Sequence, residues 1–257
     1  MLARIAFGTQ VSGIITPNPS TVLRLIEVGK QYRDRIVEAI HQGTLGIEEE
    51  TLASLSQEQR ALLEQIEEGL SPAPSRAGFL ESINRRYGYL CPRGVWPELA
   101  LIGCWLGGSA GIQAKDMCEH FNPDLAVRDM GFRATEATVS IPLEDNTPSG
   151  VLALQTNYFE FIPEENIDQE QPETLLAHQL EIGARYYLIL TTYGGLYRYD
   201  INDVVEVQGW YENTPMIAFL RKGRDMVNIT GEKLHLNQVL DAAREASKEV
   251  GFSWTQL

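Results

Sequence analysis

Apolar residues recur at helical spacing in the first third of the chain and alternate or run together in the remainder. From Thr21 to Ile40 they fall close to one face, which predicts an amphipathic helix that Gly43 ends. The helical pattern returns over residues 48–69. Ser56 and Gln59 match a capping box there, so this stretch fits one helix or two. The sequence therefore predicts a helical region ahead of the strands.

Strand-like runs begin near residue 99, where eight apolar residues, Leu99 to Leu106, predict a buried strand. This run leads into Gly107-Gly108-Ser109-Ala110-Gly111. The other expected elements are a strand and loop up to Thr16, helices over 76–87, 115–121 and 236–249, and strands over 124–129, 137–143, 158–162 and 226–229, with strand-rich sequence between 181 and 220. The strand at 158–162 alternates aromatic and polar residues, as a half-buried strand should.

The stretch Thr191–Val207 holds a Gly pair between two apolar runs. Glycine adopts backbone angles that side chains forbid, so this pattern predicts two strands joined by a tight connection. The connection would present three charged side chains at a strand end, Arg198, Asp200 and Asp203. Such a group could hold a polar ligand, or it could be a solvated hairpin with an ordinary ion pair.

Composition narrows the classes of partner. The 257 residues carry a net charge of −14, which disfavours nucleic acid and anionic membranes because both favour basic surfaces. No apolar run approaches the length of a membrane span, and the N-terminal residues lack a signal-peptide pattern. The three cysteines, Cys91, Cys104 and Cys118, have no metal-ligand spacing and fit buried thiols of a cytoplasmic protein.

Two segments carry candidate chemistry. The strand–Gly–Gly–Ser–helix pattern around Gly108 and Ser109 would let backbone approach a ligand near free helix N–H groups, although such turns also join ordinary strands and helices. The segment from Phe132 to Glu136 offers an aromatic face for a base, a hydroxyl for a phosphate and a carboxylate for Mg²⁺. Alternatively, Glu136 simply caps a strand.

The order of these segments resembles the auxin-responsive (Gretchen Hagen) acyl acid amido synthetases of the luciferase-like adenylate-forming superfamily. The resemblance covers most of the chain and rests on Trp96-Pro97-Glu98-Leu99, Gly108-Ser109, Phe132 to Glu136, Tyr158 to Pro163, Gly183, Thr191 to Val205 and Gly231-Glu232-Lys233-Leu234. It implies ATP-dependent formation of an acyl-adenylate, followed by amide ligation of the carboxylic acid to an amino acid or amine.

By this resemblance, Phe132 stacks on adenine, Thr135 contacts phosphate and Glu136 holds Mg²⁺. Asp203 would bind the ribose hydroxyls and Arg224 would reach ribose or phosphate, while Lys233 would belong to a mobile small domain. The implied nucleotide-binding set is Gly108, Ser109, Phe132, Arg133, Ala134, Thr135, Asp203 and Arg224, with Glu136 for the metal; no catalytic residue is assigned. Arg133 and Asn202 stand where the family has small residues, and Asn tolerates the positive φ that a turn requires.

The predicted fold is an α/β portion of an adenylate-forming large domain at residues 1–220, a hinge at 221–225 and the beginning of a small domain at 226–257. The Ser/Thr/Gly-rich phosphate loop of the family has no counterpart in the sequence. We therefore expect a fragment that is inactive alone and associates with itself or with a missing N-terminal half. The alternatives are a non-catalytic remnant or partner-binding subunit with weak nucleotide binding, and an acyl thioester ligase.

Overall fold

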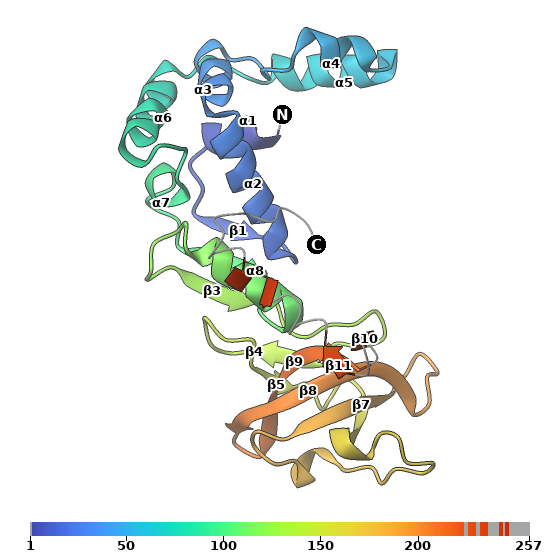
Figure 1. Cartoon of the computed structure of the whole chain (residues 1–257). Coiled ribbons are helices and arrows are strands. Elements are labelled where there is room, and N and C mark those ends of the chain that lie inside the picture. The colour runs from blue at the N-terminus through green and yellow to red at the C-terminus, as the bar shows by residue number, and fades with distance from the viewer. Residues whose placement is uncertain (1, 224–225, 230–231, 236–241, 244, 247–257) are drawn as a thin grey trace. The chain divides into compact units, whose positions relative to one another are not determined.

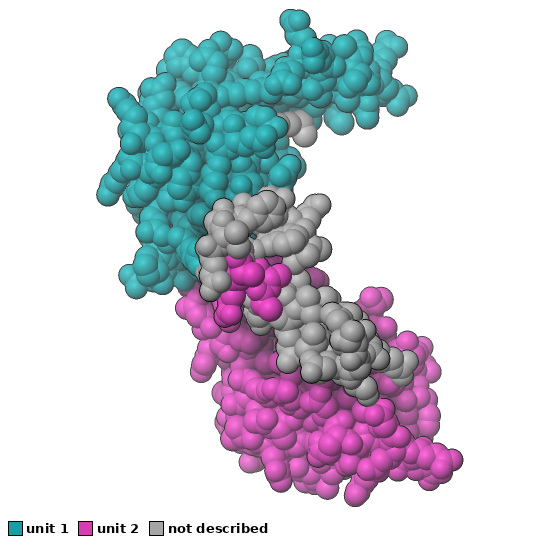
Figure 2. Space-filling model, viewed as in Figure 1, with its two compact units in different colours: residues 1–14, 20–101, 116–125 teal, residues 15–19, 102–115, 126–257 magenta. Residues whose placement is uncertain are grey.

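The computed structural model describes residues 2–223, 226–229, 232–235, 242–243 and 245–246 (Figure 1). The chain forms two compact units, which Figure 2 shows in teal and magenta. The first unit comprises residues 1–14, 20–101 and 116–125, and the second comprises residues 15–19, 102–115 and 126–257.

The first unit is mainly helical, as the hydrophobic pattern predicts. Its helices are α1 Leu2–Gly8, α2 Pro19–Gln31, α3 Arg33–Gln42, α4 Glu49–Ser54, α5 Gln57–Glu68, α6 Pro74–Tyr87 and α7 Pro92–Val95. The prediction of a strand and loop up to Thr16 is wrong for residues 2–8, which form helix α1 and contact α3. Arg4 of α1 donates from Nε to the Thr44 carbonyl at 2.9 Å, so tertiary contacts fix a helix too short to be stable alone.

Two helix boundaries follow from single residues. The helix predicted over 21–40 is interrupted at Tyr32 (φ −114°, ψ 24°) and forms α2 and α3. Gly43 ends α3 in the left-handed conformation at φ 78°, as predicted. Ser56 and Gln59 form the expected reciprocal capping box at the start of α5. Residues 48–69 are therefore two helices.

The core of the first unit is centred on Phe7, whose side chain is fully buried. Its ring stacks on that of Trp96 with centroids 5.3 Å apart. A Cβ at Gly29 of α2 would lie 2.6 Å from Phe7 Cζ, so glycine is required where the helix meets this ring. Trp96 Nε1 donates to the Thr9 carbonyl at 3.0 Å, which satisfies the buried indole.

Two small sheets accompany these elements. Strands β1 Gly13–Ile15, β2 Leu101–Cys104 and β3 Ala126–Asp129 form one sheet in that order, and β10 Met226–Ile229 pairs with β11 Glu232–His235. The strand predicted over 99–106 is present as β2, and the one expected over 226–229 is β10. Helix α8 begins at Gly108 and ends at Cys118, earlier than the predicted 115–121. The helix expected over 236–249 lies largely outside the described residues.

The second unit contains a six-stranded antiparallel sheet in the order β4-β5-β9-β8-β7-β6. Its strands are β4 Ser140–Pro142, β5 Gly150–Leu152, β6 Tyr158–Pro163, β7 Arg185–Thr191, β8 Tyr199–Tyr211 and β9 Thr214–Lys222. The hairpin expected at Thr191–Val207 is confirmed, since β7 and β8 pair with Leu190 opposite Tyr199. The 3₁₀ turns η1 Glu164–Asn166 and η2 Ala177–Gln179 lie in the connection between β6 and β7.

Both faces of the central strands are buried. On β7, Tyr186, Leu188 and Leu190 join one apolar cluster. Tyr187 and Ile189 join a second cluster. Successive side chains of a strand point to opposite faces, so apolar groups cover the sheet on both sides. The half-buried alternation expected for 158–162 is wrong, because Phe159 through Ile162 are all buried.

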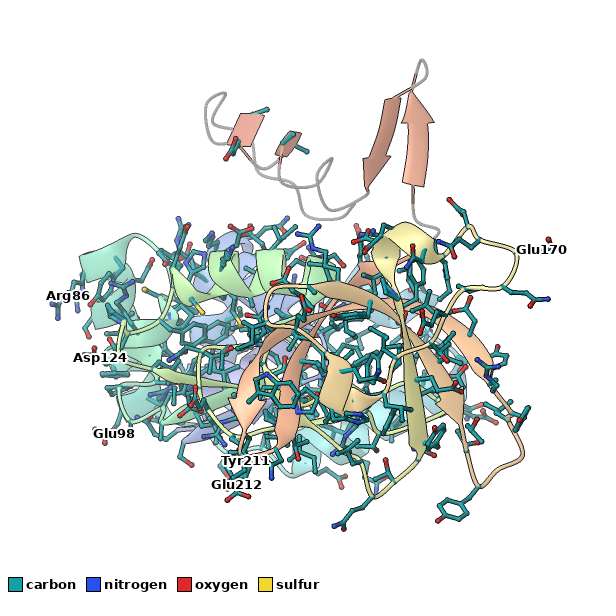
Figure 3. All side chains as sticks on the ribbon, turned by 90° about the horizontal axis from the view of Figure 1, so that it is seen from below. Arg86, Glu98, Asp124, Glu170, Tyr211 and Glu212 are labelled. Carbon is teal, nitrogen blue, oxygen red and sulfur yellow. The ribbon has the colours of Figure 1, made fainter. Side chains whose placement is uncertain are left out.

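The turn between β8 and β9 contrasts with this core. Tyr211 is 51% exposed, and Glu212 holds φ at 53°. Both side chains point away from the ribbon in Figure 3. Within the described part of the chain, no helix has the length and apolar character needed to cross a membrane.

Candidate nucleotide site

One pocket of about 370 Å³ lies in the second unit. Its walls come from the start of α8, the end of β3 and the segment after it, β8 and β9. They comprise Asn18, Trp105, Gly107, Ser109, Ala110, Gln113, Asp129, Gly131, Phe132, Arg133, Ala134, Pro148, Asp203, Phe219 and Lys222. Segments that are far apart in sequence thus converge on one cavity.

The pocket brings together five of the residues predicted for the nucleotide, namely Ser109, Phe132, Arg133, Ala134 and Asp203. Thr135 and Glu136 follow directly in the chain and are exposed rather than part of the wall. Arg224 lies outside the described residues, as does the side chain of Lys233. The assignment of each residue to a ligand stays a prediction.

An aromatic pair forms the apolar part of the pocket. The rings of Phe132 and Phe219 lie 5.2 Å apart at an interplanar angle of 45°. Gly108, the first residue of α8, has φ 55°, and a Cβ there would approach Phe219 Cε1 to 2.8 Å. Gly108 therefore lets the helix start pack directly on this aromatic pair. The observed neighbour of Gly108 is Phe219, and the expected approach of this backbone to a ligand stays a prediction.

Asp203 is the most deeply buried carboxylate of the pocket, at 2% exposure. The Lys222 ammonium lies 2.5 Å from its Oδ1 in an ion pair. Burial raises the pKa of Asp203 because the charged form loses solvation. Lys222 counteracts this rise, whereas Glu136 and Asp200 add to it.

Asp129 ties two segments of the pocket wall together. Its Oδ2 accepts a hydrogen bond from the Leu106 N–H, and its Oδ1 accepts one from the Gly131 N–H, each at 2.6 Å. Burial raises the pKa of this carboxyl, and the two backbone donors partly offset the rise. Gly131 has φ 82°, and a Cβ there would lie 2.6 Å from the Ser140 carbonyl oxygen. Asp129 thus joins the α8 turn to the residue preceding Phe132.

The expected grouping of Arg198 with the two aspartates does not occur. Arg198 Nε instead pairs with Oε2 of Glu160 on β6 at 3.1 Å. The Arg198 backbone, at φ 44°, donates to Thr191 Oγ1 at 3.0 Å. Arg198 therefore contributes to the packing of β6 against the hairpin, and Asp203 reaches the pocket without it.

Sequence reasoning missed Lys222, Asp129 and Phe219. Lys222 belongs to the segment expected to be a hinge, but it is the last residue of β9, directly opposite Asp203 in the strand pairing. Asp129 is the last residue of a predicted strand, just before the Phe132 segment, and this position could have marked it as a pocket residue. Phe219 had no local signal, since its position depends on the β8–β9 register.

The residues present fit an adenine nucleotide in part. An aromatic pair beside a buried carboxylate suits a base and a hydroxyl-bearing sugar. No group of three or more His, Cys, Asp or Glu side chains suited to a metal occurs among the described residues. Mg²⁺ commonly takes one or two protein carboxylates together with substrate phosphates, and Glu136, which is exposed, stays the predicted carboxylate for it.

Two family models match the chain. The GH3 family N-terminal domain matches residues 1–126, and the GH3 family central domain matches residues 150–222. Together these ranges cover more than half of the sequence.

Curated plant proteins agree with these matches. The indole-3-acetic acid-amido synthetase GH3.3 of Arabidopsis thaliana is 28% identical over 167 residues, covering 63% of this chain and 28% of the relative. The indole-3-acetic acid-amido synthetase GH3.10 of the same plant is 24% identical over 270 residues, covering 95% of this chain and 44% of the relative. The chain thus spans less than half the length of these relatives.

A solved structure has the same fold. The structure described as AtGH3.15 acyl acid amido synthetase in complex with 2,4-DB superposes with a TM-score of 0.74 at 20% sequence identity, covering 97% of this chain and 42% of that chain. The α/β adenylate-forming fold expected from the sequence is therefore confirmed. The chain belongs to the GH3 family.

Proposed function

We propose that the second-unit pocket binds the adenosine part of ATP and that the chain serves an acyl acid amido synthetase reaction. The observation that carries the proposal is the buried Asp203 carboxylate in one cavity with the Phe132–Phe219 pair. Family membership supports it, because the named relatives join an acid to an amine.

In the proposed reaction, the substrate carboxylate attacks the α-phosphorus of ATP, forming an acyl-adenylate and releasing pyrophosphate. The amine of an amino acid then attacks the acyl carbon and AMP leaves, giving an amide. Phe132 faces the base, Asp203 accepts hydrogen bonds from the ribose hydroxyls, and Thr135 contacts phosphate. Glu136 would hold Mg²⁺, which would neutralise charge on the phosphates. Arg224 would contact ribose or phosphate.

The phosphate-gripping half of the site is proposed to come from outside these 257 residues. The chain spans less than half of its relatives, and its sequence has no Ser/Thr/Gly-rich phosphate loop. Donors fixed in advance around the developing charge account for much of the rate of such reactions. We therefore expect the chain alone to bind nucleotide and to need a segment carrying that loop for turnover.

Substituting Asp203 tests the nucleotide assignment. Asp203→Ala should weaken ATP binding about 10- to 100-fold, because hydrogen bonds to a charged acceptor contribute about 1.5–3 kcal/mol. Calorimetry with ATP and Mg²⁺ measures the effect. Asp145→Ala is the matched control, since that carboxylate pairs with Arg128 at 2.6 Å and does not line the pocket. Equal affinity of the two variants would contradict the assignment.

Activity is tested by supplying the family's N-terminal segment as a second polypeptide. The expected result is acid-dependent exchange of labelled pyrophosphate into ATP, followed by amide formation with an amino acid. Nucleotide binding without exchange, over a broad panel of acids, would favour the non-catalytic subunit. Thioester formation with coenzyme A in place of amide would favour the acyl thioester ligase.

Partners and compartment are part of the same proposal. Self-association or docking to the missing segment is expected because edge strand β4 and the residue after it expose Ile141 (53%) and Leu143 (44%). Light scattering after size exclusion would show a species heavier than one chain. The three cysteines form no disulfide, and Cys91 and Cys104 are buried as expected while Cys118 is exposed. Free thiols support the cytoplasm as the proposed location.

A further inference from the structure

The buried Asp203 carboxylate needs a nearby positive charge to stay ionised, and its own strand, β8, does not supply one. A carboxylate at 2% exposure is poorly solvated, and an ionised group in such a place must be paired. The charged neighbours Glu136 and Asp200 are both acidic and disfavour its ionised form. Asp129 and Arg133 line the same pocket, and neither is recorded in contact with Asp203. A nearby cation is therefore required if the carboxylate is to be charged.

Lys222 is that cation. Its Nζ lies 2.5 Å from Asp203 Oδ1 and also donates to the Ile201 carbonyl at 3.3 Å. Asp203 and Lys222 are direct cross-strand partners in the β8–β9 ladder, where opposite charges attract. Among the described residues, Lys222 is the single cation recorded in contact with this carboxylate.

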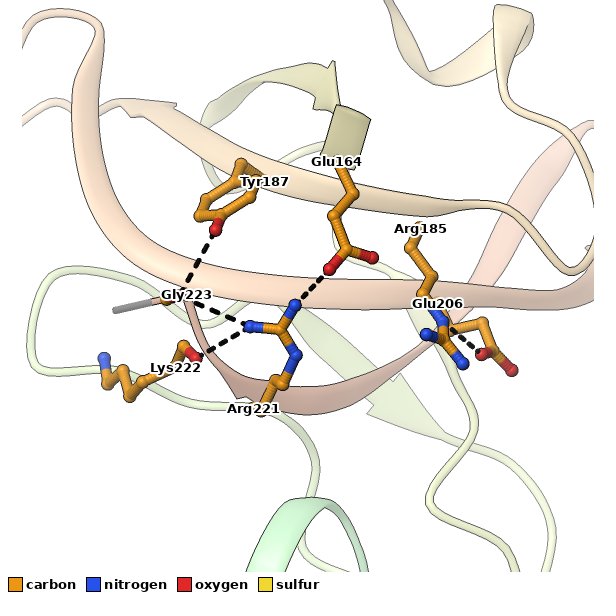
Figure 4. A network of polar contacts seen from close by, with 7 residues as sticks. All are labelled: Glu164, Arg185, Tyr187, Glu206, Arg221, Lys222 and Gly223. Atoms are coloured by element: carbon orange, nitrogen blue, oxygen red, sulfur yellow. Dashed lines mark hydrogen bonds and ion pairs between the residues drawn. The ribbon is translucent and has the colours of Figure 1, made fainter. Parts of the chain in front are cut away.

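The backbone of Lys222 is fixed by a second group of contacts, which Figure 4 shows. Arg221 Nη1 donates to the carbonyls of Lys222 and Gly223 at 3.1 and 3.4 Å, and its Nη2 pairs with Glu164. The Gly223 N–H donates to the Asn202 carbonyl at 2.7 Å, next to Asp203. These contacts fix the backbone position from which the Lys222 side chain reaches Asp203.

We propose that Lys222 is a positioning residue of the nucleotide site, whose ammonium holds the Asp203 carboxylate charged and oriented so that its second oxygen, Oδ2, accepts from the ribose. This inference rests on the proposed function. Oδ1 is buried, and its contact within the described part of the chain is the ion pair with Lys222; no hydrogen bond to Oδ2 occurs among the described residues. Lys222 acts through Asp203 and needs no contact with the nucleotide.

The test compares Lys222→Met with Lys222→Arg. Methionine keeps the apolar stem and removes the charge, whereas arginine keeps the charge. Lys30→Met is the control, since it removes a lysine paired with Glu27 at 2.8 Å in the first unit. The Asp203 carboxyl is titrated by carbon NMR in each full-length protein. In parallel, calorimetry measures adenosine affinity against pH, using adenosine because it has no phosphate to titrate.

Lys222→Met should raise the titration midpoint of Asp203 by about one to three pH units, because an opposite charge in contact shifts a carboxyl by that amount. The pH below which adenosine affinity falls should rise equally. Lys222→Arg should restore both values, and Lys30→Met should leave both unchanged. An unmoved Asp203 midpoint in Lys222→Met overturns the inference. Weaker adenosine binding with that midpoint unmoved also overturns it, since Lys222 would then contact the ligand itself.

The two arms separate this inference from the proposed function. If the unaltered chain binds no adenosine, the nucleotide assignment fails. The Asp203 titration still decides whether Lys222 sets the charge of the carboxylate.

Discussion

Asn202 holds a backbone conformation that few residues with side chains adopt, at φ 59°. Its N–H donates to Asp200 Oδ1 at 2.6 Å, and its carbonyl accepts from Gly223. Asparagine is among the residues that tolerate this conformation best, so the turn forms with a side chain at this position. The turn places Asp203, the next residue, in the pocket wall.

His120 should make the stability of the first unit depend on pH. Its Nδ1 lies 2.9 Å from the Tyr89 hydroxyl. Burial, followed by the charge of Lys30, lowers the pKa of His120 below its ordinary value of 6.5. The unfolded chain then binds a proton that the folded chain does not, so stability falls as pH drops from 6.5 through the lower folded pKa.

Urea unfolding at a series of pH values between 7 and 5 measures this dependence. His120→Gln keeps a polar group facing Tyr89. It should reduce the pH dependence of the unfolding free energy by an amount that corresponds to at most one bound proton per molecule. An unchanged slope in the variant would contradict the assignment of that proton to His120.

At the scale of elements, periodicity predicted helices better than it predicted their interruptions. The apolar face of residues 21–40 continues across Tyr32, so nothing local marks the division into α2 and α3. Capping was more informative, because both members of the Ser56–Gln59 box lie within one turn and need no distant partner. Helix caps could therefore be predicted from the sequence, whereas helix interruptions that depend on tertiary packing could not.

Removing the α5 cap tests this local origin. Ser56→Ala should destabilise α5 by about 1 kcal/mol, since the Gln59 N–H loses its acceptor. No residue of α5 is buried, so the effect should stay within that helix. Hydrogen exchange of the first-turn amides should quicken about fivefold. Ser54→Ala is the control, because Ser54 Oγ donates only to the carbonyl of Thr51 within α4.

At the scale of the whole molecule, the sequence predicted part of the pocket, including Asp203 on β8, and missed the residues that β9 contributes. Phe132, Arg133 and Ala134 are consecutive, so one motif identified them. Lys222 and Phe219 enter the pocket through the register of β9 against β8, which shifts at two irregular positions. A shift of one residue turns every following side chain to the opposite face, so local patterns could not have placed them. The division at 221–225 into large and small domains stays a prediction.

The sheet should supply most of the stability of the second unit. Phe161 of β6 is fully buried and meets Tyr186 edge to face, with centroids 6.2 Å apart. Phe161→Ala should lower the free energy of unfolding by about 3–5 kcal/mol. Tyr211→Ala, at the exposed β8–β9 turn, should change it by about 0.5 kcal/mol or less. Similar losses for both variants in urea titration would contradict this placement of the core.

Trp105 gives the pocket a natural optical reporter. It lines the cavity and is 39% exposed, whereas Trp96 of the first unit is buried. An indole at a partly open wall changes its emission when a ligand displaces the water around it. With Trp210→Phe and Trp254→Phe together, Trp105 and the buried Trp96 are the remaining tryptophans, and nucleotide titrations would follow Trp105 emission without any attached dye. The same wall that shapes the site would then show when the site is filled.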